Sequence, residues 1–247
     1  MHISLGCKKQ SEHHINRFED ALTSAFFGTI KYLPSRVTAE LFQALFASKS
    51  SSLSQLFCDI KQQDDLIVKM IFWPRIGSVE PDLQIEFSSA LTNVTLLIEC
   101  KWKSGESSDC QLLNQWKALS SKGKINAYHI YLVKDPSKAN REIARNLEKA
   151  AGLPEWSGRL LLVTWLEILK SIGKLPDSYP SVVKDWKGDM VSMFRRIAIF
   201  EFGGFSSLSS ILIDDVSERG FWNTAFQGFH KLDKVNVNQI RGKVFFN

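Results

Sequence analysis

Residues 80–103 read E-P-D-L-Q-I-E-F-S-S-A-L-T-N-V-T-L-L-I-E-C-K-W-K, two β-prone segments joined by a polar turn. From Asp82 to Phe87 polar and apolar residues alternate, which predicts a half-buried strand. Residues 94–98 are almost wholly apolar, which is typical of a strand covered on both faces. Because the segment between them is rich in Ser and Asn, we expect a turn and an antiparallel hairpin.

The charged residues of this hairpin are predicted to meet at one end of it. Glu99 and Lys101 are two positions apart and so point to the same face of their strand, and Asp82 opens the neighbouring strand. Carboxylates and an ammonium at the end of a buried strand are costly unless they are paired or bind an ion. Two convergent carboxylates offer the oxygen ligands that Mg²⁺ prefers. With a lysine beside them to stabilise negative charge, this set suits phosphodiester hydrolysis.

The segments that flank the hairpin predict an α/β protein. Apolar periodicity predicts helices over 11–28 (ended by Gly28), 38–48, 107–122, 138–151 and 165–171, and strands over 66–73, 127–133 and 160–164. Ser107, Ser108 and Asp109 are the expected N-caps of the helix after the hairpin, and the Ser-rich residues 49–55 read as a loop or a frayed helix start. Because strands alternate with helices after the hairpin, we expect at least one parallel pairing.

Pro81-Asp82 followed by Glu99-Cys100-Lys101 resembles the motif of the PD-(D/E)XK nuclease superfamily, the fold of many restriction endonucleases. The resemblance covers about residues 11–170. It implies a restriction endonuclease-like core, in which a helix precedes a three-strand meander, followed by a helix and a further strand of a mixed sheet. It also implies Asp82 and Glu99 as metal-binding carboxylates, the Cys100 carbonyl as a further ligand, and Lys101 as the catalytic lysine.

The same resemblance implies supporting residues on two helices. Family members often carry a glutamate on the first helix, for which Glu19 is the best match, with Asp20 and Glu12 as neighbouring alternatives. A glutamine near the site often lies on the helix after the motif, a role open to Gln111 or Gln115. The implied activity is that of a Mg²⁺-dependent endonuclease, with Mn²⁺ as a substitute, acting on DNA in a defence, repair or transposition system.

Two other functions stay open from the sequence. A non-catalytic DNA-binding or scaffold subunit could keep the fold, although it would have no need of the intact Asp82, Glu99 and Lys101. A metal-dependent hydrolase of another phosphate ester is the third possibility. Four further lysines (Lys103, Lys117, Lys122 and Lys124) could line a phosphate track, although each by itself reads as a surface residue.

Composition places the chain among ordinary globular proteins. Its 247 residues carry a formal net charge of +5, and its four cysteines have no CxxC spacing, so a disulfide framework or zinc site is not expected. The sequence contains no run of about 18 apolar residues, so we expect no membrane span. The cytoplasm is the expected location. We expect a nuclease core over 1–176 and a C-terminal appendage over 177–247, which could be a surface for a homodimer or a protein partner.

Overall fold

The structure is a computed structural model that describes residues 14–102, 106, 108, 110–119, 126–150 and 153–199, with residues 14–17 and 154 described by their backbone alone. It has a five-stranded mixed sheet in the order β1-β2-β3-β4-β5. The strands are β1 (Ile67–Phe72), β2 (Leu83–Ser88), β3 (Asn93–Lys101), β4 (Ala127–Val133) and β5 (Leu160–Thr164). The first three pair antiparallel, whereas β3, β4 and β5 run parallel, as the alternation of strands and helices predicts.

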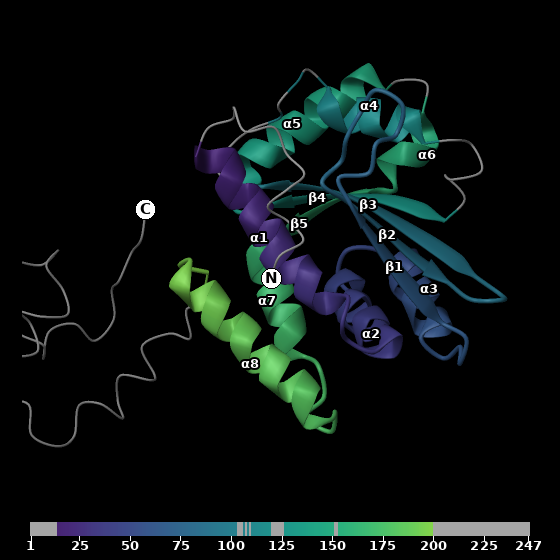
Figure 1. The fold of residues 1–247 in the computed structure, drawn as a ribbon. Coiled ribbons are helices and arrows are strands. Elements are labelled where there is room, and N and C mark those ends of the chain that lie inside the picture. The colour runs from purple at the N-terminus through teal and green to yellow at the C-terminus, as the bar shows by residue number, and fades with distance from the viewer. Residues whose placement is uncertain are drawn as a thin grey trace, which may run out of the picture. The chain divides into compact units, whose positions relative to one another are not determined.

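Helices cover both faces of the sheet (Figure 1). One face is covered by α1 (His14–Ile30), α2 (Ser35–Phe46), α3 (Ser51–Ile60), α7 (Trp165–Gly173) and α8 (Ser181–Arg196). The other face is covered by α4 (Gln111–Ala118), α5 (Pro136–Lys149) and the short α6 (Pro154–Ser157). The α/β class is therefore confirmed. The order of a helix, an antiparallel meander, a helix and a parallel strand is consistent with the restriction endonuclease-like core that the resemblance implies.

Two hydrophobic cores explain the sequence pattern of β3. Its residues Val94, Leu96, Ile98 and Cys100 belong to the core beneath α1, α2 and α7, whereas Leu97 belongs to the core beneath α4 and α5. A strand buried on both faces loses the alternation of polar and apolar residues, and that is why its sequence is almost continuously apolar. β2 faces a core on one side only, so Leu83, Ile85 and Phe87 are buried and the residues between them are half-buried.

The register of the sheet leaves the end of β3 beyond the end of β2. Leu83, the first residue of β2, pairs with Ile98, so Glu99 and Lys101 have no partner in β2. On the other edge β3 remains paired to β4, with Glu99 opposite Tyr131 and Lys101 opposite Val133. The last three residues of β3 are thus held by one neighbouring strand while their other edge is open to side chains.

Of the two alternatives predicted for the Ser-rich segment, the structure shows a helix start, because α3 begins at Ser51. The side chain of Ser50 accepts a hydrogen bond from the amide of Leu53 at 3.3 Å and caps the helix. Phe57 then packs edge-on against Phe87 of β2, with ring centroids 4.8 Å apart. The run of serines therefore supplies the cap and the first turn of a helix.

Two helix ends also differ from prediction. α1 continues through Gly28 to Ile30, since a glycine ends a helix only where the chain turns out of it. The N-cap position of α4 is Cys110, not Ser107, Ser108 or Asp109, and it makes no side-chain cap hydrogen bond. Phe18 of α1 is 39% exposed and lies against Trp102.

The expected boundary between residues 176 and 177 falls inside a compact unit. α8 buries Val183, Trp186, Met190 and Phe194 in the core beneath α1 and α7, and the compact unit runs to Glu201. Residues 200–247 lie outside the described residues, so the partner surface predicted for the appendage stays a prediction. None of the described helices combines the length and apolar character that a membrane crossing requires.

Candidate active site

Two carboxylates take the place of a strand along the open edge of β3. Asp82 Oδ2 accepts a hydrogen bond from the Cys100 amide at 2.7 Å, and Glu19 Oε1 accepts one from the Trp102 amide at 2.8 Å. Amides two residues apart point to the same edge of a strand, and β2 has ended before it reaches them. The acid that precedes β2 and the acid from α1 therefore meet beside the end of β3. Glu19 makes this contact, whereas Asp20 is half-buried and Glu12 lies outside the described residues.

Cys100 contributes its backbone to this edge and its side chain to the core. In an extended strand the N–H and C=O of one residue point to the same side, so the Cys100 carbonyl faces the edge where Asp82 lies. Its thiol is 2% exposed among apolar residues. Burial first, and the charge of Asp82 second, raise the pKa of this thiol well above its usual value, so it stays protonated.

Glu99 is the most enclosed carboxylate of the site, with 2% of its surface exposed. Gln111 Nε2 donates to Oε1 at 2.7 Å, and Gln115 Nε2 donates to Oε2 at 2.7 Å. The two glutamines are four residues apart on α4, so they face the sheet together, and both of the predicted candidates reach the same carboxylate. Lys101 Nζ lies 2.8 Å from Oε1 and completes a shell of three donors.

Lys101 lies within the field of all three acids. Its side chain is 11% exposed, and burial alone would lower the pKa of its ammonium. The charges of Glu99 and Asp82, with a smaller contribution from Glu19, outweigh burial and raise the pKa above its usual value. In this structure Lys101 is therefore a positively charged group between a strand edge and a buried carboxylate.

The donor set fits Mg²⁺ only as a partial cage. Asp82, Glu99 and the Cys100 carbonyl offer oxygen atoms alone, which is the ligand chemistry of Mg²⁺. Within the described residues, however, no group of three or more His, Cys, Asp or Glu side chains is placed to hold a metal ion. Mg²⁺ sites that act on phosphates commonly use one or two carboxylates and leave the other positions to water and substrate. The residues present fit that type of site.

Side chains distant in sequence hold α4 in place. Cys110 has a left-handed backbone (φ 53°), so the first amides of α4 are capped from elsewhere. Glu106 Oε1 accepts from the Leu112 amide at 3.3 Å, and Asn146 Oδ1 of α5 accepts from the Leu113 amide at 3.0 Å. Asn146 also donates to Glu106 at 2.7 Å, and Arg145 forms an ion pair with Glu106. This network fixes the helix that carries both glutamines.

His129 of β4 lies behind Gln115. Its Nε2 is 3.1 Å from Gln115 Oε1, and its ring packs against both Trp116 and Trp156, which also pack against each other. Because Gln115 donates its Nε2 to a carboxylate, its Oε1 must accept, which assigns the proton of the neutral ring to Nε2 of His129. Burial lowers the pKa of His129 to about 3, so the ring is neutral at physiological pH.

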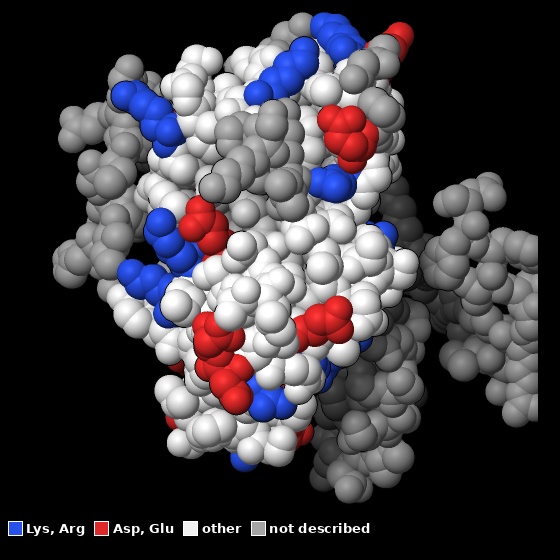
Figure 2. Space-filling view, turned by 90° about the vertical axis from the view of Figure 1, so that its right-hand side faces the viewer, with Lys and Arg blue, Asp and Glu red and all other residues white. Residues whose placement is uncertain are grey.

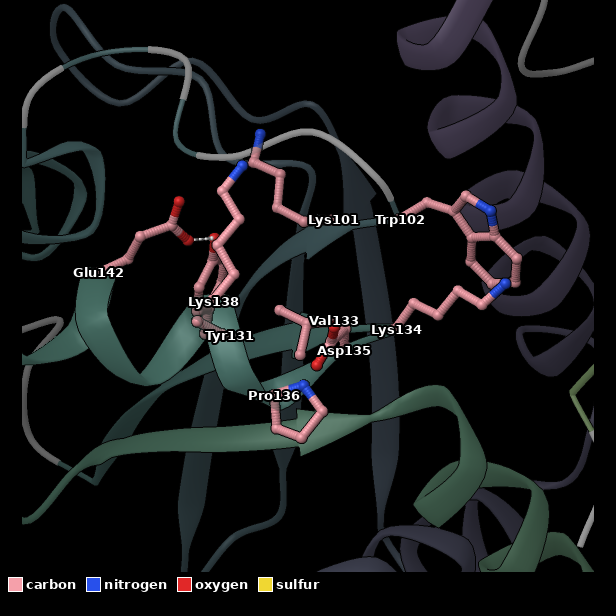
Figure 3. A pocket seen from close by; sticks show the side chains of 10 residues that line it. Lys101, Trp102, Tyr131, Val133, Lys134, Asp135, Pro136, Lys138 and Glu142 are labelled. Atoms are coloured by element: carbon pink, nitrogen blue, oxygen red, sulfur yellow. Dashed lines mark hydrogen bonds between the residues drawn. The ribbon is translucent and has the colours of Figure 1, made fainter. Parts of the chain in front are cut away.

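A pocket of about 490 Å³ opens beside Lys101 (Figure 3). Its walls come from the ends of β3 and β4 and from the first turns of α5. Lys101, Lys134 and Lys138 line it together with Trp102, and Lys134 Nζ lies 4.4 Å from the centre of the Trp102 ring. On its far wall Tyr131 donates to Glu142 at 2.5 Å. Basic groups and the indole ring of Trp102 thus adjoin the acidic site.

The structure brings together Glu19, Asp82, Glu99, Lys101, Gln111 and Gln115, all of which the sequence analysis named. It adds supporting residues that the sequence analysis missed: Trp102, Glu106, His129, Glu142 and Asn146. Some of them carry a signal. Trp102 follows the motif directly, His129 is a polar residue in an otherwise apolar strand, and Glu142 and Asn146 are buried polar residues four apart on α5.

Only one of the four lysines of the predicted phosphate track is among the described residues. Lys117 is exposed on α4, whereas Lys103, Lys122 and Lys124 lie outside the described residues. On the face drawn in Figure 2, basic and acidic side chains are interspersed and do not gather in one stripe. The positive groups nearest the acidic site are instead those of the pocket beside Lys101.

Comparison with known proteins gives little beyond the geometry. No family model matches the chain, and no curated protein matches it. Among solved structures, the chain is similar to the MspJI restriction endonuclease in complex with a 27-mer oligonucleotide, with 13% sequence identity and a TM-score of 0.27. The likeness covers 80% of this chain and 40% of that one. A TM-score this low carries no argument, so the functional inference rests on the residues of the site.

Proposed function

We propose that this protein is a Mg²⁺-dependent nuclease that hydrolyses phosphodiester bonds in DNA. The observation that carries the proposal is the convergence of Asp82, Glu99 and Lys101 at the end of β3. Two carboxylates and a lysine in this order, at the end of a buried strand with a supporting glutamine shell, are the residue types that phosphodiester hydrolysis needs.

Each residue has a role that follows from its position. Asp82, Glu99 and the Cys100 carbonyl would hold the ion, which when bound neutralises phosphate charge and makes a bound water more acidic. Lys101, with its ammonium 2.8 Å from Glu99, would orient the attacking water and stabilise the negative charge that develops on the phosphate. Gln111 and Gln115 keep the Glu99 carboxylate in one orientation. Glu19 fixes the backbone at Trp102.

The test compares cleavage of plasmid and single-stranded DNA by the wild-type protein with that by Asp82→Asn and Lys101→Met, in Mg²⁺ and in Mn²⁺. Asn at position 82 keeps an oxygen that can accept from the Cys100 amide, so its fold should be retained. Loss of one such electrostatic group commonly lowers the rate by about a hundred- to a thousandfold. Matched controls are Asp185→Asn and Lys184→Met, two exposed residues of α8.

Metal-dependent cutting that both site variants lose and both control variants keep would support the proposal. Cutting that persists in Asp82→Asn and Lys101→Met would contradict the residue assignment. If no substrate is cut, Mg²⁺ binding is measured by calorimetry. Binding by the wild-type protein that Asp82→Asn loses would support the metal site and point to a missing target sequence. No binding by the wild-type protein would reject the nuclease.

One observation favours a second function, a non-catalytic DNA-binding or scaffold subunit. Both oxygens of Glu99 already accept hydrogen bonds, and Lys101 is held against one of them, so the group satisfies itself as a buried polar network. A scaffold with this network would bind DNA with no dependence on metal. Its affinity would be equal in wild type and Asp82→Asn, in Mg²⁺ and in EDTA.

A further inference from the structure

Among the described residues, two lysines of the pocket beside Lys101 form no ion pair. Lys134 and Lys138 are exposed, and among the described residues no carboxylate lies within ion-pair distance of either ammonium. The two acids of the pocket are engaged: Asp135 accepts from the Ser137 amide, and Glu142 accepts from Tyr131 and the Glu106 amide. Lysines grouped around one cavity repel each other unless an anion joins them, so the pocket favours an anionic ligand.

The wall opposite these acids offers an aromatic surface. Trp102 is half-buried, and its ring packs against Phe18, with centroids 5.2 Å apart and planes tilted by 54°. Lys134 Nζ covers the ring at 4.4 Å. In Figure 3 the side chain of Lys134 extends along Trp102, while Lys101 and Lys138 reach toward another part of the pocket. Because Lys134 is exposed, its ammonium can leave the Trp102 ring, and a planar base can then stack on that ring.

A phosphate beside an aromatic ring is the recognition chemistry of a nucleotide. We propose that this pocket binds one unpaired nucleotide of a nucleic-acid strand, with its phosphate between Lys134 and Lys138 and its base stacked on Trp102. The volume of about 490 Å³ is within the range of small-molecule pockets and large enough for one nucleotide. In binding, Lys134 leaves the ring for the phosphate and so exposes the ring to the base.

Stacking on Trp102 demands an unpaired base. In a duplex the phosphates face outward but each base is enclosed by its pair and its neighbours, so a base must leave the stack to reach a protein ring. Trp102 directly follows Lys101, and both line the pocket. The unpaired nucleotide is thus next to the scissile phosphate, and the substrate is single-stranded or opened at the point of cleavage. The position beside the scissile phosphate rests on the proposed nuclease function, whereas the binding of an unpaired nucleotide does not.

Binding can be tested without cleavage, in EDTA, by the fluorescence anisotropy of a labelled oligothymidylate and of a duplex of the same length. We expect the single strand to bind more tightly than the duplex. Trp102→Leu should weaken single-strand binding about tenfold, the usual effect of one lost stacking contact, and leave duplex binding unchanged. Trp102→Phe keeps an aromatic face and should restore most of the affinity, which a merely structural role for the indole does not predict.

Salt dependence tests the phosphate contact separately. Lys134→Met should make the plot of log affinity against log salt concentration shallower by about 0.7, the value for one lost phosphate contact on a single strand. Lys184→Met, an exposed lysine of α8, should leave the slope unchanged. A slope equal in wild type and in Lys134→Met would overturn the assignment of the phosphate.

Three other outcomes decide the remaining points. If Trp102→Leu weakens the binding of duplex and single strand equally, or weakens neither, the proposal that an unpaired base stacks on Trp102 is overturned. If thymidine monophosphate binds as tightly as the oligonucleotide, the ligand of the pocket is a free nucleotide and the proposal of a nucleic-acid strand is overturned. Single-strand binding that depends on Trp102 in a protein that cuts nothing would support this inference while rejecting the nuclease.

Discussion

Gln115 donates from Nε2 to Oε2 of Glu99 at 2.7 Å, and this bond joins the candidate site to the core of the protein. The other end of the same amide contacts the fully buried His129, whose ring packs against Trp116 and Trp156. A carboxylate that is 2% exposed thus takes its orientation from an amide that is 1% exposed. The consequence is that the position of Glu99 depends on the packing of residues that no substrate reaches.

Gln115→Glu should therefore destabilise the protein strongly. The substitution keeps the shape of the side chain but sets a second carboxylate against Glu99, where no water can screen the two charges. We expect a loss of about 3 kcal/mol in the free energy of unfolding at pH 7, measured by urea denaturation. Gln111→Glu is the control, because Gln111 is half-buried and the same change there should cost only about 1 kcal/mol. Equal losses in the two variants would contradict the difference in burial.

The ion pair of Glu99 and Lys101 should be coupled more strongly than a surface pair. Their side chains are 2% and 11% exposed, whereas Lys187 and Asp177 form a pair at 3.0 Å in which Asp177 is 90% exposed. Double-mutant cycles with Glu99→Gln and Lys101→Met, and with Asp177→Asn and Lys187→Met, measure both couplings. We expect about 2 kcal/mol for the first pair and at most about 0.5 kcal/mol for the second. A first coupling no larger than the second would mean that the glutamines alone stabilise Glu99.

The strands and the core of the site could be predicted from the sequence because both follow from local patterns. Alternation in β2 and the apolar run of β3 reflect which faces are buried, and the motif fixes Asp82, Glu99 and Lys101 along those strands. The order of helices and strands could be predicted for the same reason, because it too follows from local sequence patterns. The apolar residues of α8 also have helical spacing, at Val183, Trp186, Met190 and Phe194, although the sequence analysis assigns this segment to an appendage.

What the sequence could not provide are contacts between distant residues. The start of α4 is capped by Glu106 and Asn146, and no local rule pairs the latter, 33 residues away, with the amide of Leu113. Three local capping candidates precede the helix, so propensity favoured them and tertiary packing overrode it. In the same way, Trp102 directly follows β3 and Lys134 directly follows β4, and the two meet only through the parallel pairing of these strands.

The cap from Asn146 yields a test that separates positioning from general stability. Asn146 is fully buried, and Asn146→Leu removes its bonds to the Leu113 amide and to Glu106, so we expect a loss of about 2 kcal/mol in unfolding free energy. Val163→Ala, a fully buried change in β5, is a control of similar cost. At a temperature where both are folded, Asn146→Leu should lower DNA cleavage at least tenfold relative to Val163→Ala, because α4 carries Gln111 and Gln115. Equal rates would show that α4 does not need this cap.

His129 should make the protein sensitive to mild acid. Its pKa is about 3 in the folded state, because of burial, and about 6.5 in the unfolded chain. The unfolded state therefore binds a proton first, and the stability present above pH 6.5 falls as the pH drops toward 3, by up to about 1.4 kcal/mol per pH unit. His129→Gln removes this titration and should flatten the dependence between pH 6.5 and 5, where few carboxylates titrate. Unfolding free energies measured by urea at several pH values give the two slopes. If the slope of the variant equals that of the wild type, the buried neutral imidazole is not the source of acid sensitivity.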